Sequence, residues 1–123
     1  MARICIVEDS LDAAKRRYGF LAKTLHEVHV VFDNTEVNSR YVDILWPAAG
    51  FDLNRVRYGL EGNFPDADLY FVDGLKGDCF RIIDKVGKDR AYINSSDFQI
   101  LARAEDEGYK VTWKPQEIVE RLS

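Results

Sequence analysis

Short apolar runs alternate along this chain with segments of helical spacing, and this alternation limits the folds that it can adopt. Five runs rich in β-branched and aromatic residues predict strands, at residues 3–7, 27–32, 68–72, 91–94 and 110–113. Strands that alternate with helices favour a doubly wound α/β fold. Helices would then cover both faces of a five-stranded parallel sheet, joined by right-handed crossovers.

Capping residues mark where the helices are expected to begin. The first helix follows Ser10 and presents one apolar stripe, made of Leu11, Ala14, Tyr18, Leu21 and Leu25. A short helix is predicted at residues 78–87. Ser96 and Gln99 match the S-x-x-Q capping box ahead of a third helix, and Pro115 suits the first position of the last one.

The size and charge of the chain narrow the classes of function. With 123 residues, 46% of them hydrophobic and 31% charged, the sequence is expected to form a single domain over residues 1–123. Its formal net charge of −4 argues against direct binding of nucleic acid, because phosphate contacts need a basic surface. We therefore expect no nucleic acid among its direct partners.

The sequence indicates a cytoplasmic protein without a membrane partner. No apolar run approaches the roughly 18–20 residues that cross a bilayer. The acids Glu8 and Asp9 also interrupt the start of the chain, where a signal peptide would continue apolar. Cys5 and Cys79 lie in or beside apolar stretches without a C-x-x-C spacing. Buried thiols are therefore expected rather than a disulfide.

One segment, residues 35–68, does not follow the alternation. It contains five glycine and proline residues that interrupt regular structure: Pro47, Gly50, Gly59, Gly62 and Pro65. One or two short helices at most are expected between them. The segment is therefore interpreted as an atypical insertion, an elaborated region between the second and third strands of the single domain.

Polar residues gather at the predicted carboxyl ends of the strands. Glu8 and Asp9 end the first strand, Asp73 the third, Ser95 the fourth and Lys114 the fifth. In doubly wound folds this edge of the sheet opens into the crevice where ligands bind. Adjacent carboxylates repel one another unless they bind a proton or a cation, and Mg²⁺ favours a few carboxylates together with several waters. The pattern predicts a magnesium site.

Four stretches, in chain order, resemble the receiver domain of two-component response regulators. "ICIVEDS" resembles the strand with the acid pair, and "PDADLYFVD" the segment that leads to the phosphoacceptor aspartate. "AYINSS" stands where the hydroxyl-bearing strand ends, and "DEGYKVTWKP" resembles the segment with the family's lysine and proline. The resemblance covers nearly the whole chain except residues 35–63. It implies a flavodoxin-like, receiver-like sheet of order 2-1-3-4-5.

The resemblance also implies a chemistry and partners. Asp73 would accept a phosphoryl group, with Mg²⁺ held by Glu8, Asp9 and Asp73 itself. Ser95 would hydrogen-bond the phosphoryl group and Lys114 would balance its charge. A histidine kinase or another phosphodonor would supply the group, and an unknown protein target would receive the signal. Such a protein is no enzyme beyond gaining and losing its own phosphoryl group.

Departures from the receiver pattern leave two other functions open. Asp73 lies 64 positions after Asp9 and 22 before Ser95, the first interval longer and the second shorter than usual. Val111 stands where many receivers have the aromatic residue that changes rotamer. One alternative is therefore a phosphorylation-inactive interaction module of the receiver fold. The stretches "INSSD" and "EDEGYKVTWKP" also resemble small stand-alone receiver-like proteins of phages and bacteria. The other alternative is a small metal-dependent phosphoester hydrolase that uses the same acids.

Overall fold

The protein is described by a computed structural model, which covers residues 2–33, 41–46, 56–58 and 64–122. The strands are β1 (Arg3–Glu8), β2 (Glu27–Asp33), β3 (Tyr41–Trp46), β4 (Val56–Tyr58), β5 (Leu69–Asp73), β6 (Ala91–Asn94) and β7 (Lys110–Val111). The helices are α1 (Leu11–Tyr18), α2 (Asp78–Val86), α3 (Phe98–Glu107) and α4 (Pro115–Glu120), with short 3₁₀ turns at Gly19–Lys23, Leu75–Gly77 and Lys88–Arg90. Among these described helices, none is both long and apolar enough to cross a membrane.

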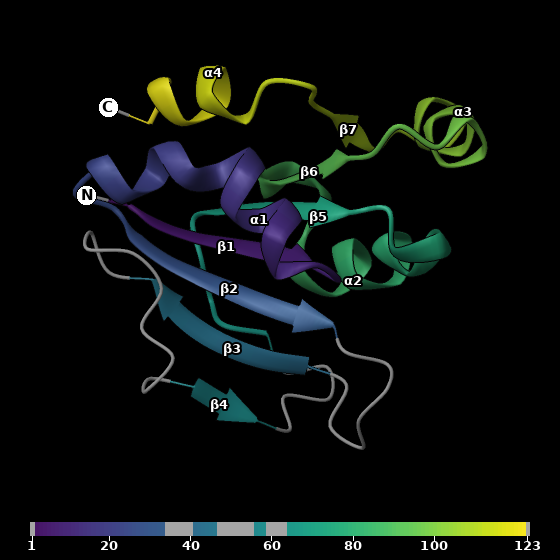
Figure 1. Cartoon of the computed structure of the whole chain (residues 1–123). Helices are drawn as coiled ribbons and strands as arrows, with labels where there is room; N and C mark the ends of the chain where they lie inside the picture. The colour runs from purple at the N-terminus through teal and green to yellow at the C-terminus, as the bar shows by residue number, and fades with distance from the viewer. Residues whose placement is uncertain (1, 34–40, 47–55, 59–63, 123) are drawn as a thin grey trace.

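The strands form one sheet in the order β4-β3-β2-β1-β5-β6-β7 (Figure 1). Neighbours from β2 through β1, β5 and β6 to β7 all pair in parallel. In chain order these are the five predicted strands, so the predicted parallel sheet of order 2-1-3-4-5 is confirmed. Helices flank this sheet, and the arrangement is consistent with a flavodoxin-like fold.

Two further strands extend the sheet at one edge, which the sequence analysis did not predict. β3 pairs antiparallel with β2 over six positions, from Val28 opposite Trp46 to Asp33 opposite Tyr41, and β4 pairs antiparallel with β3. The expectation of short helices was therefore wrong for residues 41–46 and 56–58. The stretch "YVDILW" is rich in residues that favour strands, and this preference outweighs the surrounding glycine and proline signals. The other residues of the 35–63 stretch lie outside the described ranges.

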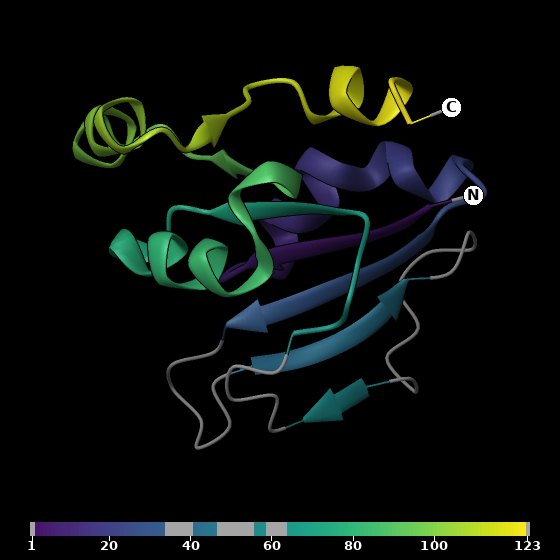
Figure 2. The same cartoon turned by 180° about the vertical axis from the view of Figure 1, so that it is seen from behind.

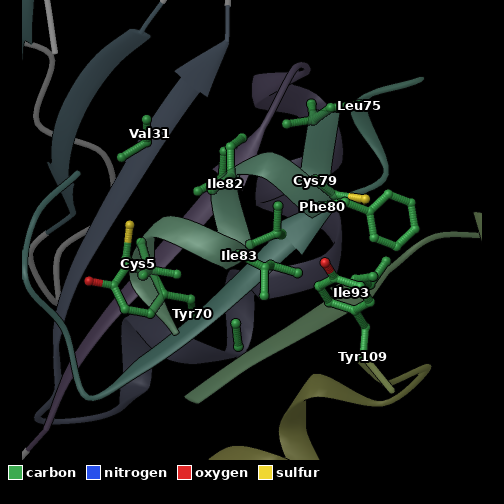
Figure 3. Packing of buried hydrophobic residues seen from close by; sticks show 14 of the residues in the cluster. Cys5, Val31, Tyr70, Leu75, Cys79, Phe80, Ile82, Ile83, Ile93 and Tyr109 are labelled. Atoms are coloured by element: carbon green, nitrogen blue, oxygen red, sulfur yellow. The ribbon is translucent and has the colours of Figure 1, made fainter. Parts of the chain in front are cut away.

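Helices cover the two faces of the parallel sheet in pairs (Figures 1 and 2). Side chains of α1 and α4 pack on one face in a cluster that includes Ile4, Ile6, Ala14, Tyr18, Leu21, Phe71 and Val119. Side chains of α2 and α3 pack on the other face in a cluster that includes Ile100. Figure 3 shows Cys79, Phe80, Ile82, Ile83 and Ile93 of the same cluster. The central strand β1 lies between these layers, and Ile4 to Val7 have no exposed surface. A strand buried on both faces reads as continuously apolar, as "ICIV" does.

The two cysteines are both buried in the described part of the chain and are not joined to each other. Cys5 and Cys79 belong to the cluster under α2 (Figure 3). Burial raises the pKa of the Cys79 thiol to about 12. The expectation of buried thiols is confirmed, and a neutral thiol of this kind packs as a small apolar group.

The first helix begins as predicted but ends early. The Ser10 hydroxyl accepts a hydrogen bond from the backbone N–H of Ala13, which confirms the expected cap. α1 ends at Tyr18 and passes into a tighter 3₁₀ turn over Gly19–Lys23. The 3₁₀ turn still buries Leu21, but Thr24 is already extended, so the helical spacing ends before Leu25. Leu25, expected on that stripe, is consequently 86% exposed.

The cap of α3 differs from the predicted capping box. The N-cap residue is Asp97, whose carboxylate accepts hydrogen bonds from the backbone N–H groups of Gln99 and Ile100. The predicted pair of Ser96 and Gln99 is therefore wrong by one residue, because an aspartate at the cap satisfies two helix donors at once. Gly108 ends the helix in a left-handed conformation.

Replacing Asp97 with alanine is expected to lower the free energy of unfolding by about 1 kcal/mol, because the two N–H groups lose their acceptor. Ser96→Ala is the matched control and should change stability by less than about 0.5 kcal/mol. Urea unfolding followed by circular dichroism measures both. Equal losses in the two variants would restore the capping box centred on Ser96.

Candidate functional site

The candidate site forms where the pleat of three adjacent strands turns polar side chains toward α1. In β1 the even-numbered residues Ile4 and Ile6 pack under α1, so Glu8 lies on the same face. In β5 the odd-numbered Leu69 and Phe71 do so, which places Asp73 there as well. Asp73 pairs in register with Asn94 of β6. The carboxyl ends of three strands therefore present polar groups to one helix.

Glu8, Asp9 and Asp73 form a compact cluster of carboxylates. Each offers one oxygen, and these oxygens all lie within 4.8 Å of one another. The cluster is graded from inside to outside: Glu8 is buried, Asp73 is intermediate and Asp9 is exposed. Asp73 is far from Glu8 and Asp9 in the sequence, so only the fold brings it to them. This is the meeting of acids that the sequence predicted.

Backbone N–H groups orient two of these carboxylates. Glu8 Oε1 accepts a hydrogen bond of 3.1 Å from the N–H of Asp9. Asp73 Oδ2 accepts one of 3.1 Å from the N–H of Leu75, across the turn that follows β5. Each bond fixes one oxygen of its carboxylate, so the second oxygen has a defined place as well.

A cation from α1 contacts the cluster. Nη1 of Arg17 lies 3.2 Å from Glu8 Oε2 and 3.2 Å from Asp73 Oδ1. The Arg17 side chain is one-third exposed, more than either carboxylate that it contacts. One nitrogen shared by two carboxylates offsets part of their mutual repulsion.

The fold opposes the ionisation of Glu8. Burial raises the pKa of its carboxyl to about 8, and the negative charge of Asp73 adds to the effect. Arg17 acts in the opposite direction without cancelling it. A protonated Glu8 at neutral pH can donate a hydrogen bond, whereas an ionised Glu8 needs a nearby cation.

A buried polar pair lies beneath the cluster. Asn94 Nδ2 donates a hydrogen bond of 3.1 Å to the Tyr18 hydroxyl, and both side chains are almost fully buried. Burial raises the pKa of the Tyr18 phenol, so this hydroxyl stays neutral. Asn94 thus ties the end of β6 to α1, the helix that holds Arg17. The pair fixes the position of α1 above the carboxylates.

Ser95 lies next to the backbone that follows Asp73. A Cβ atom added at Gly74 would meet Ser95 Oγ at 2.8 Å and Ile100 Cδ1 at 2.7 Å, so this position has no room for a side chain. The Ser95 hydroxyl accepts a hydrogen bond of 3.1 Å from the N–H of Asp97. Ser95 is therefore at the same edge of the sheet as Asp73, as the sequence predicted.

Lys114 takes a different partner. Its Nζ lies 3.7 Å from Glu117 Oε1 on α4, and its side chain is 75% exposed. Within the described residues, no ion pair joins Lys114 to the carboxylate cluster. Lys114 and Arg17 nevertheless line one cavity of about 440 Å³ between α1 and α4, which Phe20, Pro115, Gln116, Glu117 and Glu120 complete.

Sequence reasoning did not single out Arg17, nor the hydroxyl of Tyr18. A signal for Arg17 does exist in the sequence. It lies three residues after Ala14 and four before Leu21, so it shares the inward side of α1 with buried residues. A cation on that side of the helix that follows an acid-ended strand is a candidate partner for those acids.

Comparisons with known proteins add no relatives to this description. No protein-family model matches the chain, and neither a curated protein nor a solved structure resembles it at a significant level. The function is therefore argued from the geometry of the site.

Proposed function

We propose that the protein is a stand-alone receiver-like signalling protein that accepts a phosphoryl group on Asp73, with Mg²⁺ bound by Glu8, Asp9 and Asp73. One observation carries the proposal. Three carboxylates with oxygens within 4.8 Å of one another lie at the carboxyl ends of β1 and β5, in a parallel sheet of order 2-1-3-4-5. Ligands bind at this edge in doubly wound folds.

The donor set fits a small, hard divalent cation. Three carboxylate oxygens are ligands that Mg²⁺ accepts, and exposed Asp9 leaves room for the waters that this ion retains. When bound, the ion would neutralise phosphoryl oxygens during in-line transfer. The buried Glu8 would lose its proton on metal binding, because a carboxylate ligand must be ionised.

Asp73 is suited to act as the nucleophile. The N–H of Leu75 orients the Asp73 carboxylate through Oδ2, and Oδ1 lies on the side of Arg17. An Asp73 oxygen would attack the phosphorus of an acyl phosphate, and the bond from phosphorus to the donor's carboxylate oxygen would break. The donor leaves as a free carboxylate with that electron pair, Asp73 becomes an acyl phosphate, and no proton is transferred.

The predicted role of Ser95 remains part of the proposal, and Lys114 remains a source of positive charge. The position of Ser95 against Gly74 supports a hydrogen bond from its hydroxyl to the phosphoryl group. Lys114, on the wall of the cavity beside Arg17, would contribute positive charge after leaving Glu117. A histidine kinase or small phosphodonor would supply the group, and a protein target would read the phosphorylated state.

The test is incubation with Mg²⁺ and acetyl phosphate, followed by intact mass spectrometry. We expect the mass increment of one phosphoryl group in the wild type. It should be absent from Asp73→Asn, which keeps the shape of the side chain without its charge. Asp78→Asn, at the start of the nearby α2, is the control and should gain the phosphoryl group normally. Addition to Asp73→Asn, or none to the wild type, would contradict the proposal.

The contact of Arg17 favours a second candidate function, a phosphorylation-inactive interaction module of the same fold. Arg17 Nη1 already bridges Glu8 and Asp73, so the cluster has a cation of its own. Val111, which stands where many receivers have the aromatic residue that changes rotamer, is an aliphatic residue packed against the core under α2. A wild type that gains no phosphoryl group and binds no Mg²⁺ would support this candidate.

A further inference from the structure

Among the described residues, Arg17 is the cation that forms an ion pair with the proposed nucleophile, and its contacts suggest a role beyond neutralising the acids. Its Nη1 lies 3.2 Å from Asp73 Oδ1, whereas Lys114 is paired with Glu117 on α4. We propose that the Arg17 guanidinium is the phosphoryl-binding cation of this site. The inference rests on the proposed function and names a catalytic residue that the receiver resemblance does not supply.

The guanidinium can contact the carboxylates and bind a phosphoryl group at the same time. Arginine has five N–H donors in a planar fork, and the contacts with Glu8 and Asp73 engage one nitrogen, Nη1. Donors therefore remain for the oxygens of an incoming phosphoryl group, which arginine binds in a bidentate way.

The position of Arg17 also gives a phosphodonor a route to the guanidinium. The residue touches the carboxylates and lines the cavity of about 440 Å³ between α1 and α4. A small acyl phosphate fits within this volume. Lys114 and Arg17 make part of its wall positive, while Glu117 and Glu120 lie on the α4 side. Arg17 is the lining residue of this cavity that also contacts Glu8 and Asp73.

The same contacts place Arg17 in competition with a metal ion. Glu8 Oε2 and Asp73 Oδ1 are oxygens of two of the three proposed metal ligands, and Arg17 now bonds both. Metal binding would release the guanidinium from these oxygens, so that it can turn to the phosphoryl group. Arg17 should therefore weaken binding of Mg²⁺ while it speeds phosphoryl transfer.

These opposite signs make the test specific. Mg²⁺ affinity is measured by calorimetry at pH 9.5, because loss of Arg17 raises the pKa of Glu8 above about 8 and a retained proton would compete with the metal. The phosphorylation rate is measured by intact mass with Mg²⁺ and acetyl phosphate. Arg17→Met should bind Mg²⁺ severalfold more tightly and gain phosphate at least tenfold more slowly than the wild type. Arg17→Lys should recover part of the rate. Arg16→Met, at the exposed neighbouring position on α1, is the matched control and should behave like the wild type.

A second neutral variant, Arg17→Gln, keeps a hydrogen-bond donor and decides the matter if the methionine variant does not fold. Wild-type rates in these neutral variants would overturn the inference and leave the proposed function standing, as would unchanged or weaker Mg²⁺ binding. A wild type that gains no phosphate would overturn the proposed function and this inference together. A loss of rate in Lys114→Ala alone would return the role to Lys114.

Discussion

Glu8→Gln is expected to stabilise the metal-free protein by about 3 kcal/mol at pH 7. Folding raises the pKa of this carboxyl from 4.5 to about 8, chiefly through burial. At pH 7 the unfolded chain has released the proton, whereas the folded chain still binds it. From the unfolded pKa to pH 7 is roughly 2.5 pH units, and each unit lowers the free energy of unfolding by about 1.4 kcal/mol. Glutamine resembles the protonated acid in shape and hydrogen bonding, and it needs no proton.

The sign of this effect gives it a characteristic pH profile. Below pH 4.5 both the folded and the unfolded state bind the proton, so Glu8 does not lower the free energy of unfolding. The variant should then be as stable as the wild type. Between pH 4.5 and 8 the folded state binds more protons than the unfolded state, so wild-type stability falls as the pH rises. Above pH 8 the difference should be constant. The advantage of Glu8→Gln therefore grows through this window and then levels off.

Thermal and urea unfolding in the presence of a chelator, from pH 4 to 9, measure the profile. The expected gain at pH 7 corresponds to roughly 10 °C in melting temperature for a domain of this size. Glu105→Gln, at an exposed position of α3, removes the same charge without changing a buried group, and its profile should follow the wild type. A Glu8→Gln protein less stable than the wild type at pH 7 would show that Glu8 is ionised in the fold.

The parallel sheet was predictable because its strands carry their signal locally. β-branched runs such as "RICIV" mark buried strands whatever surrounds them, and each one ends at a polar residue that identifies the functional edge. β3 and β4 were missed because their stretch contains several glycine and proline residues, which indicate turns equally well. Whether such a stretch joins a sheet depends on the open edge of β2, a non-local condition.

The site was predictable in part for the same reason. Glu8, Asp9, Asp73 and Ser95 follow from where the strands end. To predict the contacts of Arg17, one must know how α1 is rotated about its axis. The Asn94–Tyr18 hydrogen bond helps to fix this rotation. The partner of Lys114 depends on α4, where Glu117 lies within one helical turn. The raised pKa of Glu8 depends on burial under α1 and on the charge of Asp73. Both effects arise from tertiary contacts.

Binding of Mg²⁺ should depend steeply on pH below 8. The ion needs an ionised Glu8, so below its pKa of about 8 each metal bound must displace one proton. The dissociation constant is expected to rise about tenfold per pH unit, to roughly 100-fold weaker binding at pH 6 than above pH 8.

Calorimetry in two buffers of different ionisation enthalpy tests both the affinity and the proton. About one proton should be released per Mg²⁺ at pH 6 and almost none at pH 9, because Glu8 is already ionised there. Glu8→Gln should bind Mg²⁺ more weakly at pH 9, and its affinity should lose this pH dependence. A wild-type affinity that stays constant from pH 6 to 9 would mean that the metal binds without Glu8. The cluster would then act through Asp9 and Asp73 alone, with Glu8 a buried neighbour that accepts a hydrogen bond from Arg17.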